Sequence, residues 1–89
     1  MYAVKIEDKA KKELRKMDQY QSRVILEWIK ENLVDTKDPR ANGAALTKNL
    51  KHFWKYRVGN YRLIANIQDD EVCIDIVKVG HRRFVYKDF

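Results

Sequence analysis

Residues 53–79 of the chain are FWKYRVGNYRLIANIQDDEVCIDIVKV, and this stretch decides the fold. Apolar and polar side chains alternate along most of it, and a period of two is typical of half-buried strands. The alternation is interrupted at Gly59-Asn60 and at Asp69-Asp70, and both steps favour tight turns. The stretch therefore predicts an antiparallel meander of three strands, at residues 53–58, 61–68 and 71–79.

A two-residue turn at Gly59-Asn60 would fix the register, with Val58 facing Tyr61 and Arg57 facing Arg62. Because successive side chains point to opposite faces, each face can be written out. One face is apolar: Trp54, Tyr56, Val58, Tyr61, Leu63, Ala65, Ile67, Val72, Ile74 and Ile76. The other face is open and basic: Lys55, Arg57, Arg62, Asn66, Cys73, Asp75 and Val77.

The opposition of Arg57 and Arg62 is the informative feature of the open face. Like charges at opposed positions in a sheet are destabilising unless a counter-charge lies between them. Asp75 is expected near Arg62 and would neutralise it, which leaves a solvated basic face as one interpretation. One carboxylate cannot balance Lys55, Arg57 and Arg62 together, so an anion site is the favoured interpretation.

The N-terminal half predicts a short strand and two helices. Tyr2, Val4 and Ile6 alternate with polar or small residues, and Glu7 or Asp8 then caps a first helix. Asp18, followed by Gln21, resembles a capping box and starts a second helix, which Asp38-Pro39-Arg40 ends. Residues 40–52 have no clean period and predict a loop with room for a short turn. The apolar stripes of the two helices are Ala10, Leu14 and Met17, then Val24, Ile25, Trp28, Ile29 and Leu33.

These elements predict an α+β fold in one domain, residues 1–89, with the helical hairpin covering the apolar face. The N-terminal strand is expected at an edge of the sheet, and a short tail follows Gly80.

Composition limits the class of function. The 89 residues carry a net charge of +6, which favours a polyanionic partner. The single cysteine, Cys73, forms no internal disulfide and builds no zinc site alone, so no metal or cofactor is expected. The sequence has neither a signal peptide nor a membrane span, and a cytoplasmic protein is expected.

Two segments together resemble a known family. The run WKYRVGNYRLI at residues 54–64, followed by VKVGHRR at 77–83 and by Val85-Tyr86, is similar to RelE-type toxins of the RelE/ParE toxin–antitoxin superfamily. Asp38-Pro39-Arg40, Gly43 and Leu46 also resemble the loop that precedes the sheet in that family. The order of strand, helical hairpin and meander matches as well.

The resemblance implies a ribosome-dependent endoribonuclease that cuts messenger RNA in the decoding site, inhibits translation, and is neutralised by an antitoxin protein. The chemistry implied is metal-independent attack of a ribose 2′-OH on the adjacent phosphate. Lys55 and Arg57 match the family's paired basic positions, and Arg62 matches the arginine that stabilises the transition state. Arg82 matches the phosphate-contacting arginine of the tail, and Tyr86 the tyrosine that orients or stacks on a base. Lys55, Arg57 and Arg83 would contact the substrate. Because arginine does not act as a base, Lys55 alone holds that option.

Alternative interpretations remain open at several positions. His81 would serve as a general acid or base, or would simply be solvated. Cys73 is expected to be a small strand residue, and Trp28 and Trp54 to belong to the core. His52 is expected to be structural.

At the level of function, the alternatives are a ParE-like inhibitor of DNA gyrase and a non-catalytic nucleic-acid-binding module.

Overall fold

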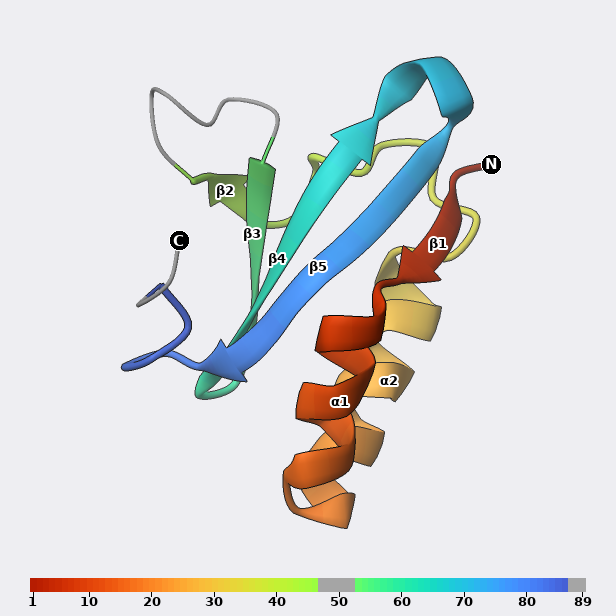
Figure 1. Ribbon diagram of the computed structural model, residues 1–89. Helices are drawn as coiled ribbons and strands as arrows, with labels where there is room; N and C mark the ends of the chain where they lie inside the picture. Colours follow the sequence, from red (N-terminus) through yellow and green to blue (C-terminus); the bar gives the residue numbers. More distant parts are fainter. Residues whose placement is uncertain (47–52, 87–89) are drawn as a thin grey trace.

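The computed structural model describes residues 1–46 and 53–86 and has the predicted α+β architecture (Figure 1). One sheet contains β1 (Ala3–Ile6), β2 (Ala44–Ala45), β3 (Phe53–Val58), β4 (Tyr61–Gln68) and β5 (Cys73–His81), in the order β1-β5-β4-β3-β2. The helices α1 (Asp8–Lys16) and α2 (Gln19–Asn32) lie together on one side of this sheet. No helix in the described ranges is long and apolar enough to cross a membrane.

The β3–β4 hairpin confirms the predicted strands and register. Val58 faces Tyr61, and Arg57 faces Arg62. Gly59 has a φ of 61°, a left-handed conformation that glycine adopts without the steric cost a Cβ would bring. The alternation of side chains therefore places the helix-covered core and the basic residues on opposite faces, as expected.

The turn after β4 differs from the prediction. Residues Asp69–Glu71 form a 3₁₀ turn, and Val72 ends it with a φ of 51°. Consequently β5 begins at Cys73 rather than at residue 71 and continues to His81. Val72 is exposed and does not belong to the apolar face, so its predicted place in the core was wrong.

A β-bulge changes the alternation along β5. Ile64 faces Lys78, whereas the next residue, Ala65, faces Ile76, so Val77 is an extra residue in β5. The sequence period placed Val77 on the open face but did not predict this extra residue, and it assigned no face to Lys78. Beyond the bulge Val79 joins the core, while Lys78 shares the open face with Ile64.

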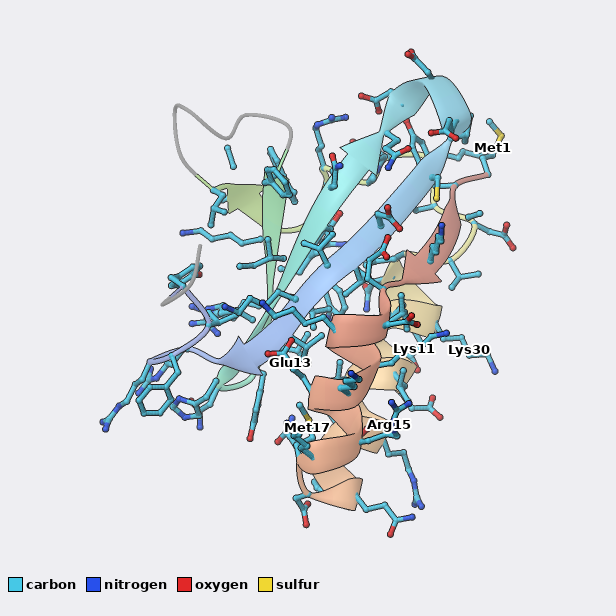
Figure 2. All side chains as sticks on the ribbon, viewed as in Figure 1. Met1, Lys11, Glu13, Arg15, Met17 and Lys30 are labelled. Atoms are coloured by element: carbon cyan, nitrogen blue, oxygen red, sulfur yellow. The ribbon has the colours of Figure 1, made fainter. Side chains whose placement is uncertain are left out.

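The helices cover the core face as predicted, except that Val24 of the second predicted stripe is exposed. The core cluster contains Ala10 and Leu14 from α1 and Ile25 and Ile29 from α2. Glu13 of α1 also reaches the sheet, where its carboxylate accepts a 3.0 Å hydrogen bond from the Val79 backbone N–H (Figure 2). Lys30 of α2 extends away from the sheet.

The helix boundaries are only partly as predicted. Asp18 is the N-cap of α2, and its side chain accepts a hydrogen bond from the Gln21 backbone N–H at 3.2 Å. Glu7 is the N-cap of α1 but makes no capping bond with its side chain. The second helix ends at Asn32, well before Pro39, because the chain turns at residues 33–35 and Asp35 takes a left-handed φ of 61°.

The two edges of the sheet complete the fold. β1 pairs in parallel with β5, which confirms the predicted edge position of the N-terminal strand. The other edge is β2, a two-residue strand that the sequence left within a loop. His52 lies outside the described residues.

Candidate functional site

The meander arranges its basic residues in two rows across the open face. Lys55 of β3, Ile64 of β4 and Lys78 of β5 form one row. Arg57, Arg62 and Gly80 form the next row, nearer the Gly59-Asn60 turn. Lys55, Arg57 and Arg62 therefore come together as predicted, because the hairpin register fixes their positions.

Backbone carbonyls hold the guanidinium of Arg62. Its Nη1 donates hydrogen bonds to the carbonyls of Gly59, at 3.1 Å, and Tyr61, at 2.9 Å. These partial negative charges lie at the turn beside the opposed Arg57. They lessen the like-charge repulsion in the way that Asp75 was expected to.

Asp75 is not the counter-charge of Arg62. It faces Asn66, four residues further along β4, so roughly 13 Å of strand separates the two positions. One oxygen of the Asp75 carboxylate accepts a 3.2 Å hydrogen bond from Gln68. The other oxygen is buried without a partner among the residues described. The predicted neutralisation of Arg62 by Asp75 was therefore wrong.

The tail, residues 82–86, folds back against the end of the hairpin. The Arg82 backbone N–H donates to the Asn60 carbonyl at 2.8 Å, and the Val85 N–H donates to the His81 carbonyl at 2.9 Å. Val85 is only 1% exposed and packs directly on Gly80, where an added Cβ would lie 3.3 Å from the Cβ of Val85. This turn carries Tyr86 to Lys55, whose ammonium lies 5.9 Å from the ring centroid, within cation–π range.

The other predicted residues of the tail have different surroundings. The side chains of Arg82 and Arg83 are exposed. The ring of His81 lies 5.6 Å from that of Tyr61 and 5.9 Å from that of Phe84. Its Nδ1 accepts a 3.2 Å hydrogen bond from the Arg83 backbone N–H. His81 thus helps to shape the tail.

Lys78 is a cation of this face that the sequence reasoning missed. Although it points to the open face, only 6% of it is exposed. The sequence indicates the orientation of Lys78 through the spacing of its apolar neighbours. Core residues stand at even positions at Ile74 and Ile76 and at an odd position at Val79. A shift of this kind indicates a bulge, and a bulge turns the residue before Val79 outward.

A cavity of about 490 Å³ opens beside β3, where Lys55, Arg57 and Arg62 meet the preceding loop. Trp28 of α2 also lines the cavity, as do residues of the loop and of β2 that precede β3. Trp28, expected only in the core, is half-buried and packs its ring 5.6 Å from that of Tyr56. The remaining residues of these walls are Asn42, Gly43, Ala44 and Tyr56.

Cys73 behaves as the small strand residue that was expected. Burial and the nearby carboxylates of Asp75 and Glu71 raise the pKa of its thiol, so the nucleophilic thiolate is disfavoured. Within residues 1–46 and 53–86, no three His, Cys, Asp or Glu side chains gather as ligands for a metal ion.

Comparison with known proteins gives consistent results. Residues 4–86 match the family described as ParE toxin of type II toxin–antitoxin system, parDE. Toxin RelG of Mycobacterium tuberculosis is 27% identical over 86 residues, which cover 97% of each chain.

Solved structures share the fold. A chain of the toxin–antitoxin complex RelBE2 from Mycobacterium tuberculosis superposes with a TM-score of 0.80 and 27% identity, covering 91% of both chains. The RelBE complex of E. coli gives a TM-score of 0.70 at 22% identity, over 91% of this chain and 96% of that one. Because the family match spans nearly all of the sequence, this chain belongs to the ParE toxin family and is a type II toxin of the RelE/ParE superfamily.

Proposed function

We propose that the protein is a ribosome-dependent endoribonuclease that cuts messenger RNA in the decoding site and so inhibits translation. The observation that carries this proposal is the meeting of Lys55, Arg57 and Arg62 at one cavity, with Tyr86 against Lys55. Arginine forks match phosphate oxygens, and tyrosine stacks on any base. Together they suit a single-stranded RNA whose phosphate must be stabilised.

The proposed reaction uses the nucleophile of the substrate itself. The ribose 2′-oxygen attacks the adjacent phosphorus, its proton passes to a base, and the bond from phosphorus to the 5′-oxygen breaks. Lys55, once deprotonated, is the base, because arginine retains its proton. Arg62 and Arg57 stabilise the negative charge that develops on the phosphorane, and Arg82 donates to the leaving 5′-oxygen. Arg83 contributes a further contact to the RNA backbone. The products are a 2′,3′-cyclic phosphate and a 5′-hydroxyl.

The experiment is cell-free translation with the purified protein, followed by analysis of the ends of ribosome-bound message. Cyclic or 3′-phosphate ends with 5′-hydroxyl ends are expected, and a 2′-deoxy nucleotide at the cut site should block cleavage. Arg62→Ala should be slow, whereas Lys30→Ala, which removes a cation on the far side of the helices, should cut normally. Primary products with 5′-phosphate ends would contradict the mechanism.

A second candidate is inhibition of DNA gyrase by binding, because the matching family is named for ParE toxins. A binding inhibitor does not need cations and a tyrosine gathered at one cavity, so this candidate explains less of the site. Expression in cells separates the two functions. A DNA-damage response with intact messages would favour gyrase, and cut messages without that response would favour the ribonuclease.

An antitoxin is the partner proposed for this toxin. Solved relatives are described as toxin–antitoxin complexes, among them RelE–RelB from Pyrococcus horikoshii OT3, at 26% identity. The basic face would receive carboxylates of the antitoxin near Lys55, Arg57 and Arg82, while an amphipathic helix would supply apolar contact. Co-expression with the neighbouring reading frame should give a co-purifying complex and relieve toxicity. Failure of both would remove this partner.

A further inference from the structure

The edge of β3 leaves backbone groups of Arg57 facing the cavity. Along an antiparallel strand, backbone N–H and C=O groups point alternately to the two sides. The Phe53 carbonyl accepts a 3.2 Å hydrogen bond from Leu46, on the side of β2, so the alternate residues Lys55 and Arg57 also direct their backbone groups there. β2 pairs only with Trp54 and Lys55. Beyond it, the donor and the acceptor of Arg57 face the cavity that this residue lines.

The chain leaves the β3 edge at Gly43. This residue has a φ of 86°, and a Cβ on it would clash with the Lys55 carbonyl. Only glycine permits both the conformation and this close approach. The chain therefore turns away before it can pair with Arg57, and the cavity occupies the space that results.

The loop that forms this wall is held in place from several directions. The indole N–H of Trp54 donates to the Asn42 carbonyl at 2.6 Å, and the hydroxyl of Tyr56 donates to the Pro39 carbonyl at 2.6 Å. Arg40 forms two 3.0 Å hydrogen bonds with Asp69. With its backbone carbonyl engaged, exposed Asn42 still has a side-chain amide that can donate and accept at the cavity.

The walls of the cavity have the chemistry of a nucleotide. Trp28 contributes a half-buried aromatic surface to these walls, and Lys55, Arg57 and Arg62 contribute positive charge. Asn42 contributes a side-chain amide, and Arg57 lines the cavity at the strand edge where its backbone groups are directed. Single-stranded RNA is recognised by stacking on aromatic rings and by hydrogen bonds to base edges, with cations on the phosphates. A volume of about 490 Å³ is in the range of small-ligand sites.

We propose that this cavity is a nucleobase-binding subsite, in which the Asn42 amide and the Arg57 backbone read the edge of one RNA base beside the phosphate held by Arg62. The subsite rests on the proposed function for its substrate class. Its consequence is a nucleotide preference that belongs to the toxin itself and not only to the ribosome.

Two variants test the subsite, with one matched control. Asn42→Ala removes the amide, and Ala44→Leu narrows the cavity. The control, Asn66→Ala, removes an amide that lies outside the cavity on the sheet face of the basic residues. Melting curves should show that all three fold. Cut sites on translated message are then mapped for each protein. At one position of the cut site, cleavage at the preferred base is compared with cleavage at the other bases. This ratio should fall roughly tenfold to a hundredfold in Asn42→Ala and Ala44→Leu, and should be unchanged in Asn66→Ala.

A second arm needs neither ribosome nor cleavage. Binding of short 2′-O-methyl RNA oligomers that differ at one base is measured by fluorescence anisotropy. Base preference in the wild type that is lost in Asn42→Ala supports the subsite, even if no message is cut and the proposed function fails. Equal base preference in wild type and Asn42→Ala, on message and on oligomers, overturns the subsite even if cleavage itself is confirmed.

Discussion

Arg62 combines a structural and a proposed catalytic role in one guanidinium. Because it would stabilise transition-state charge, Arg62→Ala should slow cleavage on the order of 10²–10³-fold. The sequence alone predicts that Arg62→Ala is as stable as the wild type or slightly more stable, because the substitution removes the repulsion between Arg62 and Arg57. The two hydrogen bonds to turn carbonyls reverse that expectation, since each contributes about 1 kcal/mol and the repulsion costs only a few tenths. Single-turnover rates and urea unfolding of the same preparation measure both effects.

Arg57→Ala is the matched control, because it relieves the same repulsion and the Arg57 guanidinium makes no hydrogen bond to the described residues. It should unfold at the same or higher urea concentration than the wild type. If Arg62→Ala is the more stable of the two variants, the turn carbonyls do not stabilise the hairpin.

Tyr56 should make stability fall at alkaline pH. Its side chain is fully buried, its hydroxyl donates to the Pro39 carbonyl, and burial raises its pKa above the ordinary value of about 10. A raised folded-state pKa means that the stabilisation is complete below pH about 10 and is lost as pH rises through the folded-state pKa. Urea unfolding between neutral and strongly alkaline pH should show this decline.

Tyr56→Phe should be less stable at neutral pH by about 1 kcal/mol and should lose part of the alkaline decline. Tyr2 retains a share of that decline, because its hydrogen bond to Asp69 raises its pKa as well. If the stability of Tyr56→Phe falls at alkaline pH as much as that of the wild type, other groups cause the whole decline.

At the scale of elements, the tail depends on Gly80. Gly80→Ala should displace Val85 and with it the contact of Tyr86 with Lys55, because the new Cβ would lie tightly against the Val85 side chain. Amide hydrogen exchange at Phe84 and Val85 should accelerate, and cleavage should slow. Gly59→Ala is the matched control: its Cβ meets nothing within 4 Å, although a φ of 61° costs about 1 kcal/mol. It should lower stability and leave exchange in the tail unchanged.

How far the sequence predicts an element depends on how local its cause is. The β3–β4 hairpin was predicted residue for residue, because period two and a two-residue glycine turn fix both strands and register. The bulge at Val77 was missed, since one extra residue becomes visible only when the core side of Val79 is known. The site divides in the same way. Lys55, Arg57 and Arg62 follow from the register, whereas Trp28 and Asn42 reach the cavity through tertiary packing, which periodicity does not encode.

At the scale of the whole molecule, the two turns of the meander carry side chains of opposite charge within the part of the chain that the structure describes. Cations gather near the Gly59-Asn60 turn, and Asp69, Asp70 and Glu71 form the opposite turn. With a net charge of +6, an acidic antitoxin segment should associate fast at low salt and more slowly as ionic strength rises. Stopped-flow mixing should give a weaker salt dependence for Arg57→Ala than for wild type. In Lys30→Ala the association rate should depend on salt as it does in the wild type. If the salt dependence is equal in both variants, the antitoxin first contacts another face of the toxin.

The parallel pairing of β1 with β5 also sets an order of events during synthesis. Ala3 pairs with Cys73, so about 70 residues must follow the first strand before its neighbour in the sheet exists. Contacts of such long sequence separation form late, because closing the intervening loop costs entropy first. The tail that brings Tyr86 to Lys55 is made later still. A ribosome that translates this message therefore carries a nascent chain whose cationic face is unfinished until almost all of residues 1–86 have emerged.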